Sequence, residues 1–128
     1  MDDKVKYWQE LSDYDLETAV AMLKSRRNLY VGFMCHQANE KIFKAYYTKL
    51  LTAVAPISHS LSYLAKKGTF YELFTEEQKT FIDQIEPLNI EARYPSDKDR
   101  LLESLTNEKC TEIIEKTRQL QQWIKVKL

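Results

Sequence analysis

The sequence is poor in glycine, proline and cysteine, and each shortage excludes a class of protein. Two glycines and three prolines in 128 residues leave few positions for the tight turns of β-hairpins. The two cysteines, Cys35 and Cys110, lack CxxC spacing and offer no disulfide framework, so each is expected to be a small buried apolar group. No apolar run approaches the roughly 18 residues of a membrane span, and the N-terminus is charged rather than signal-like. These features predict a cytoplasmic protein without a membrane segment.

The chain also lacks a net charge, because 19 basic side chains balance 19 acidic ones. A molecule without net charge has no general field that attracts nucleic acid or an anionic membrane. The charges are unevenly distributed, since residues 24–49 hold six basic side chains and one acidic side chain. The sequence therefore allows a local basic patch around this segment.

Apolar residues recur at helical spacing along most of the chain and predict an all-α fold. Two long helices are expected over residues 3–24 and 29–51, and the short connection between them makes them antiparallel. The length and the 44% apolar content suit one domain over residues 1–128. The sequence predicts an antiparallel bundle of four to five helices.

Two shorter helices are expected after the long pair. A third helix begins at Ser58 or Ser60 and ends near Gly68, where a left-handed residue is easiest to accommodate. A fourth helix begins at a capping box formed by Thr75 and Gln78, and it should end before the EARYP segment.

The stretch ARYPSDKD, residues 92–99, is expected to be a loop, because Pro95 favours an extended residue before it and the polar cluster lacks periodicity. A last helix should begin near Thr106. Arg93 in the loop can either clamp a phosphate or carboxylate with its forked guanidinium or pair with an acid such as Glu91.

His36, Glu40 and Lys44 lie four residues apart and share one helix face. Polar pairs one turn apart are routine on exposed faces, where an ion pair is worth only about 0.3–0.5 kcal/mol. A capping or turn role is expected for His59. Cys35 and His36 point about 100° apart on a helix, which is poor geometry for a thiolate and its base. The spacing of cysteines and histidines matches no zinc site, so neither a metal nor a cofactor is expected.

Three motifs, HQANEKIFKAYY, PISHSLSYL and EARYP, occur in this order along most of the chain. The ordered set resembles the HEPN family, named for higher-eukaryote and prokaryote nucleotide-binding domains. The resemblance implies an antiparallel helical bundle like the substrate-binding subunits of nucleotidyltransferases. Members commonly form homodimers and often act with a minimal nucleotidyltransferase. Carried over residue by residue, it implies a ligand-binding set of Gln37, Glu40, Lys41, Lys44, His59, Arg93 and Tyr94.

Many members of that family are metal-independent ribonucleases, an activity linked to an Arg followed four to six residues later by a His. This sequence departs from the pattern, since no histidine follows Arg93 and none occurs beyond His59. RNA cleavage by 2′-hydroxyl attack needs a group that moves a proton near neutral pH, a role suited to His. We therefore expect no catalytic residues.

The leading hypothesis is a dimeric, non-catalytic partner of a minimal nucleotidyltransferase in a toxin–antitoxin-like module. It would bind a nucleotide or nucleic acid through Lys41, Lys44 and Arg93. One alternative is a metal-independent ribonuclease toxin using Arg93 with His59 or His36. The other is a structural oligomerisation domain with tryptophans and exposed tyrosines at its contact.

Overall fold

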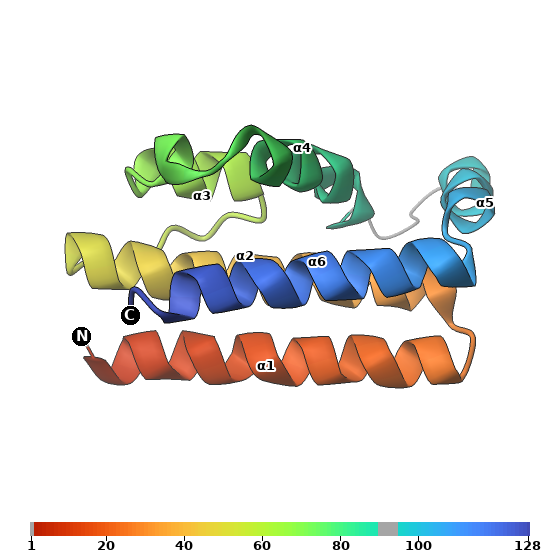
Figure 1. Cartoon of the computed structure of the whole chain (residues 1–128), viewed down its shortest axis with the longest axis horizontal. Coiled ribbons are helices and arrows are strands. Elements are labelled where there is room, and N and C mark those ends of the chain that lie inside the picture. Colours follow the sequence, from red (N-terminus) through yellow and green to blue (C-terminus); the bar gives the residue numbers. More distant parts are fainter. Residues whose placement is uncertain (1, 90–94) are drawn as a thin grey trace.

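The protein is described by a computed structural model over residues 2–89 and 95–128, without the side chains of residues 95–97. None of the helices in those ranges is both long and apolar enough to cross a membrane. They contain no strand. The elements in chain order (Figure 1) are α1 (Asp2–Lys24), α2 (Asn28–Leu51), α3 (Leu61–Lys67), the 3-10 helix η1 (Tyr71–Leu73), α4 (Glu76–Ile85), the 3-10 helix η2 (Glu86–Asn89), α5 (Pro95–Ser104) and α6 (Asn107–Lys125).

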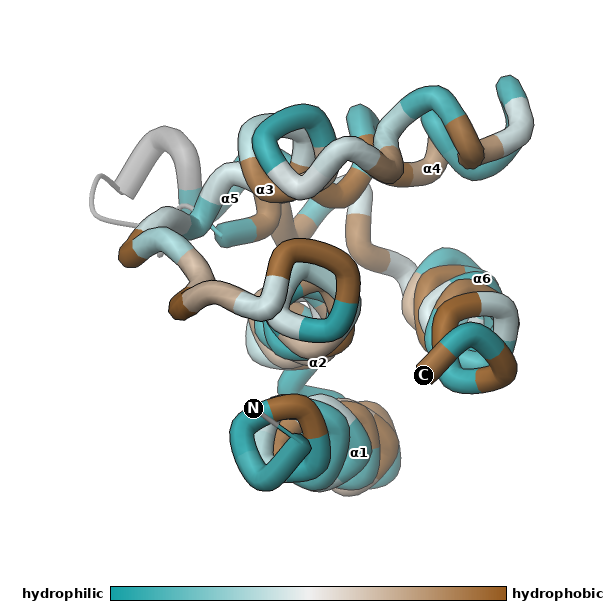
Figure 2. Tube along the Cα trace, turned by 90° about the vertical axis from the view of Figure 1, so that its left-hand side faces the viewer, coloured by the Kyte–Doolittle hydropathy of each residue, from teal (hydrophilic) through white to brown (hydrophobic). Residues whose placement is uncertain are grey.

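Helix α2 lies at the centre of the bundle. It runs antiparallel to α1 on one side, has α6 beside it, and is covered on the opposite side by α3 and α4 (Figures 1 and 2). It contacts each of the five other α-helices as well as η2. Because a central helix has almost no face left for water, its polar side chains must find partners inside the protein.

Aromatic side chains fasten the segment from α3 to η1 onto α2 and α6. The Phe70 ring packs edge-on against Phe43, with centroids 5.6 Å apart, and lies 4.7 Å from the Tyr46 ring. Phe74 lies 5.2 Å from Trp123 of α6. Aromatic pairs at such separations contribute about 0.5–1.5 kcal/mol beyond the area they bury. This cluster fixes the position of α3, from whose start the site described below is built.

The start of α3 is as predicted, but its end differs. Ser60 is the N-cap, and its hydroxyl accepts a hydrogen bond from the amide of Tyr63. The prediction of a left-handed Gly68 is wrong, because that residue has φ −76° and the left-handed residue is Thr69, with φ 68°. The glycine is required for packing instead, since a Cβ there would lie 2.5 Å from a ring carbon of Phe70.

The predicted helices over the remaining chain are confirmed, and one further helix is present. Thr75 and Gln78 form the expected capping box, and Thr106 caps α6. The prediction of a loop at residues 92–99 is wrong from Pro95 onward, because α5 begins there. Proline is favourable at the first position of a helix, where its missing N–H is not needed. The all-α bundle is thus confirmed, with six α-helices in the described ranges.

Candidate functional site

The polar line on α2 is buried. His36 is 0% exposed, Glu40 2% and Lys44 7%. The interpretation of this line as a solvated helix face is therefore wrong. The reason is tertiary: the residues lie on the side of α2 that is covered by the segment leading into α3 and by the start of η2.

Glu40 is the centre of the first polar cluster. Its Oε2 accepts a hydrogen bond from Nζ of Lys44 at 3.0 Å, and its Oε1 lies 2.9 Å from Nδ1 of His59. The ammonium of Lys44 also lies 5.2 Å from the centre of the Trp8 ring on α1. The expected pairing of Glu40 with Lys44 is confirmed, but both partners are removed from water, so the energetics of a surface pair do not apply.

His59 is the member of this cluster that reaches the surface, with 64% of its side chain exposed. A carboxylate only accepts hydrogen bonds, so the ring nitrogen facing Glu40 is the donor. The other ring nitrogen, Nε2, lies on the far side of the ring and faces away from Glu40. The expected capping or turn role is wrong, because Ser60 caps α3. His59 instead presents an imidazole oriented by a buried carboxylate.

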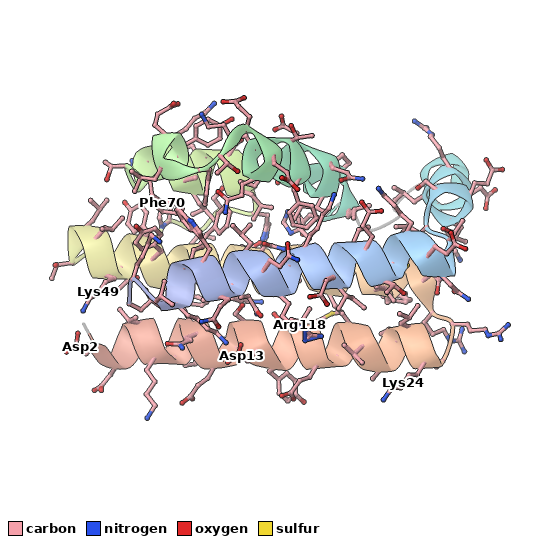
Figure 3. The ribbon with its side chains drawn as sticks, in the orientation of Figure 1. Asp2, Asp13, Lys24, Lys49, Phe70 and Arg118 are labelled. Carbon is pink, nitrogen blue, oxygen red and sulfur yellow. The ribbon has the colours of Figure 1, made fainter. Side chains whose placement is uncertain are left out.

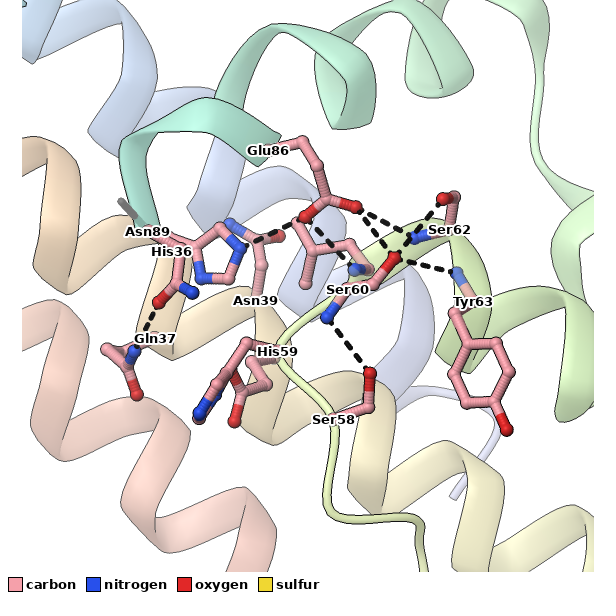
Figure 4. A network of polar contacts seen from close by, with 12 residues as sticks. His36, Gln37, Asn39, Ser58, His59, Ser60, Ser62, Tyr63, Glu86 and Asn89 are labelled. Carbon is pink, nitrogen blue, oxygen red and sulfur yellow. Dashed lines mark hydrogen bonds and ion pairs between the residues drawn. The ribbon is translucent and has the colours of Figure 1, made fainter. Parts of the chain in front are cut away.

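Glu86 forms the second cluster (Figure 4). Its Oε2 lies 3.2 Å from Nε2 of His36 and accepts the amide N–H of Leu61 at 3.1 Å. Its Oε1 accepts the Ser60 hydroxyl at 3.2 Å and the amide of Ser62 at 3.3 Å. One carboxylate thus joins η2, the start of α3 and the centre of α2.

The environment of Glu86 keeps its carboxyl ionised. Burial is the largest influence and acts to raise its pKa, but hydrogen bonds from His36 and from the amides of Leu61 and Ser62 outweigh it and hold the pKa below its usual value. The other ring nitrogen of His36, Nδ1, is buried without a partner among the described residues. Sequence reasoning missed Glu86, since a single acid after a helix has no distinguishing pattern.

Lys41, the second lysine of the α2 motif, belongs to a third chain of contacts. Its Nζ donates to Asp15 of α1 at 2.7 Å and to Oε1 of Gln37 at 3.1 Å. Gln37 in turn donates to Asn89 at 3.1 Å. Both lysines predicted to contact a ligand are therefore neutralised by acids of this chain, and Lys41 keeps only 18% of its side chain exposed.

Five of the seven predicted ligand-binding residues are thus distributed over two neighbouring contact chains on α2. Gln37 and Lys41 form one, and Glu40, Lys44 and His59 form the other. The remaining two, Arg93 and Tyr94, lie outside the described residues.

Neither cysteine is placed as a nucleophile. Both are buried, as predicted. Burial raises the pKa of Cys35 to about 12 and that of Cys110 to about 11, so neither forms a thiolate near neutral pH. Within the described ranges, no three His, Cys, Asp or Glu side chains come together in a way that could hold a metal ion.

The family model of the HEPN domain matches residues 5–127, which is nearly the whole chain. The chain belongs to the HEPN domain family. Membership supports a nucleotide- or RNA-related role at the level of the family.

The fold of this HEPN domain is similar to a solved structure, the crystal structure of TT1696 from Thermus thermophilus. The TM-score is 0.81 over 98% of each chain, at 18% sequence identity, so the likeness concerns the fold alone. No curated protein matches the chain.

Proposed function

We propose that this HEPN domain is a non-cleaving nucleotide- or nucleic-acid-binding protein whose ligand contacts the exposed imidazole of His59. The observation that carries the proposal is the buried pair behind that ring. Glu40 and Lys44 are almost fully removed from water, and the carboxylate uses one oxygen to orient an exposed side chain. Buried charge of this kind is costly for a small bundle, and its placement behind one surface imidazole is typical of functional sites.

The arrangement suits a phosphate group. With Nδ1 held by Glu40, a protonated His59 has its Nε2–H available for a phosphate oxygen, in the manner of other charge-assisted hydrogen bonds. Lys41 is the partly exposed cation of the neighbouring contact chain, and Arg93 is proposed to add its guanidinium. Lys44, whose ammonium is engaged by Glu40, is proposed to act by fixing that carboxylate.

A second copy of the chain and a minimal nucleotidyltransferase are the proposed partners, as in a cytoplasmic toxin–antitoxin-like module. Exposed apolar side chains on both sides of His59 in the sequence support a protein contact in this segment, since Val54 is 76% exposed, Ile57 101% and Tyr63 46%. Exposed apolar side chains grouped together are typical of protein-binding surfaces. Light scattering tests the homodimer, and Ile57→Glu should shift it toward monomer.

Isothermal titration with ATP, GTP and short RNAs tests the binding proposal. We expect binding by the natural sequence and a loss of at least about tenfold in affinity for His59→Ala and Arg93→Ala, as for charge-assisted contacts to phosphate. Lys49→Ala is a matched control, because this exposed lysine lies nine residues beyond Glu40 on α2, about 14 Å along the helix, near its C-terminal end (Figure 3). Absence of binding, or equal affinities in all variants, would contradict the proposal.

A ribonuclease is the second candidate, and one observation favours it. An imidazole with a carboxylate behind it can move a proton, and His59 has this geometry, with its other ring nitrogen unbonded within the described part of the chain. His36 cannot serve, since it is 0% exposed. Incubation of the protein with cellular RNA in EDTA separates the candidates: intact RNA excludes the nuclease, whereas cleavage abolished by His59→Ala excludes the inert binder.

A further inference from the structure

The turn between α1 and α2 holds exposed cations that the described part of the chain does not neutralise. Lys24, Arg26 and Arg27 are exposed, and none of them forms an ion pair with a described residue. The sequence has no acidic residue between Glu17 and Glu40. Lys41 and Lys44 of α2 are neutralised by acids, so three of the four cations of the basic segment that lack an ion pair with a described residue lie at this turn, and the fourth, Lys49, lies at the other end of α2.

Arg26 occupies a position at which the backbone favours glycine. The amide of Arg27 donates to Met22 O at 2.8 Å and that of Arg26 to Leu23 O at 3.0 Å, the two hydrogen bonds of a Schellman motif. Arg26 has φ 58°, in the left-handed region where a side chain is unfavourable and glycine is not. The C-terminus of α1 would therefore form at least as well without this arginine.

Arg27 is likewise not explained by helix formation. It is the N-cap of α2 but makes no side-chain capping bond, whereas Ser, Thr, Asp and Asn are preferred there. The first turn of α2 contains no acid, so a cation also faces the positive end of the helix dipole unopposed. Lys24 is explained by the helix dipole, because a cation is favourable at the C-terminal end of α1. The same argument disfavours Arg27, because it lies at the N-terminal end of α2.

An exposed aromatic ring lies beside these cations. Tyr30 is 55% exposed and lies in the first turn of α2, three residues after Arg27. Asn28, between them, donates to Leu105 O at 2.8 Å and to Asn107 at 2.9 Å, which ties the turn to the junction of α5 and α6. The turn thus presents cations and a ring from a fixed backbone.

We propose that this turn is a second binding surface, separate from the His59 site, for the backbone of a single-stranded nucleic acid. Lys24, Arg26 and Arg27 contact successive phosphates, and a base stacks on Tyr30. Free cations beside an exposed ring are the features by which proteins hold single strands without reading sequence. The inference rests on the proposed function and adds a ligand class to it. Arg27 at the turn and Glu40 behind the His59 site are separated by about 20 Å along α2. A single strand can span that separation, whereas a mononucleotide cannot.

Fluorescence anisotropy with labelled single-stranded RNA and DNA of about 12 nucleotides, at several salt concentrations, tests the inference. The double variant Arg26→Gly/Arg27→Ser places the residues that the backbone favours, so we expect its melting temperature to be unchanged or higher. Its affinity should fall, and the slope of log K against log salt should decrease in magnitude by about 1.4, or about 0.7 for each lost phosphate contact. Tyr30→Ala should lower the affinity at least about fivefold.

Lys49→Ala is the control for charge alone and should leave affinity and slope close to those of the natural sequence. Strand binding with an unchanged slope in the double variant overturns the inference, and loss of that binding in His59→Ala would then leave the proposed function standing. Binding of ATP or GTP without binding of single strands likewise overturns the inference and leaves the proposed function standing. If neither mononucleotides nor strands bind, both proposals are wrong.

Discussion

Replacing Lys44 with methionine should destabilise this domain far more than the loss of an ordinary i, i+4 ion pair. Methionine keeps most of the volume next to Trp8 and removes the ammonium from Glu40. An exposed pair of this spacing is worth about 0.3–0.5 kcal/mol. Here the side chains of Lys44 and Glu40 are only 9% and 2% exposed, so the variant leaves a carboxylate without its main partner in a nearly dry site. Breaking a buried pair costs about 3–5 kcal/mol, and we expect a loss in that range.

Urea unfolding followed by circular dichroism at 222 nm measures this loss, and a double-variant cycle identifies its cause. Glu40→Leu/Lys44→Met removes both charges and should be more stable than Lys44→Met alone by about 1 kcal/mol or more, because no unpaired charge remains. A loss below about 1 kcal/mol for Lys44→Met would refute the reasoning, since it would mean that water already screens the pair. Strict additivity of the two single variants would refute it as well.

Three further predictions follow from the contacts. The pKa of Glu86 is lower in the folded protein than its unfolded value of 4.5, so Glu86 stabilises the fold above pH 4.5 and this stabilisation is lost as the pH falls through the folded pKa. Glu86→Gln should therefore weaken the pH dependence of the urea midpoint between pH 5 and pH 2. Cys35 and Cys110 should both resist a thiol reagent at pH 8 in the native state and react in denaturant, and native reactivity would contradict their burial. Thr75→Ala removes the capping box of α4 and should cost about 1 kcal/mol, checked by thermal melting with exposed Thr111→Ala as a control.

Local signals were sufficient for most of the fold. Apolar periodicity predicted both ends of α1 and α2 and the start of α6 to within a residue or two, and the caps at Ser60, Thr75 and Thr106 were each visible in the sequence. Helix α5 was missed because Pro95 and the charged residues after it have two local interpretations. Tertiary contact decides between them, since Leu101 of α5 packs against the core and Leu105, directly after the helix, is buried.

Several residues of the candidate site were named from the sequence, but Glu86 was missed and the arrangement of the residues was not predicted. Helical spacing places Glu40 and Lys44 together, yet no local pattern indicates that the segment before α3 would cover them and bring His59 to the carboxylate. Contacts such as those between His36 and Glu86 join residues 50 positions apart. Partner choice at that separation depends on how the layers pack, which a single sequence does not encode in any short motif.

Helix α3 has seven residues, too few to persist without tertiary support, and the carboxylate at the beginning of η2 accepts two of its first amides. Formation of this helix is therefore energetically linked to the docking of η2, 26 positions further along the chain from Ser60. His59 lies directly before Ser60, the N-cap of that helix, so the orientation of its ring depends on the same equilibrium. A molecule that binds η2 and displaces Glu86 would therefore change the orientation of the His59 ring without contacting it. By reciprocity, a ligand bound to His59 would change the affinity of η2 for that molecule.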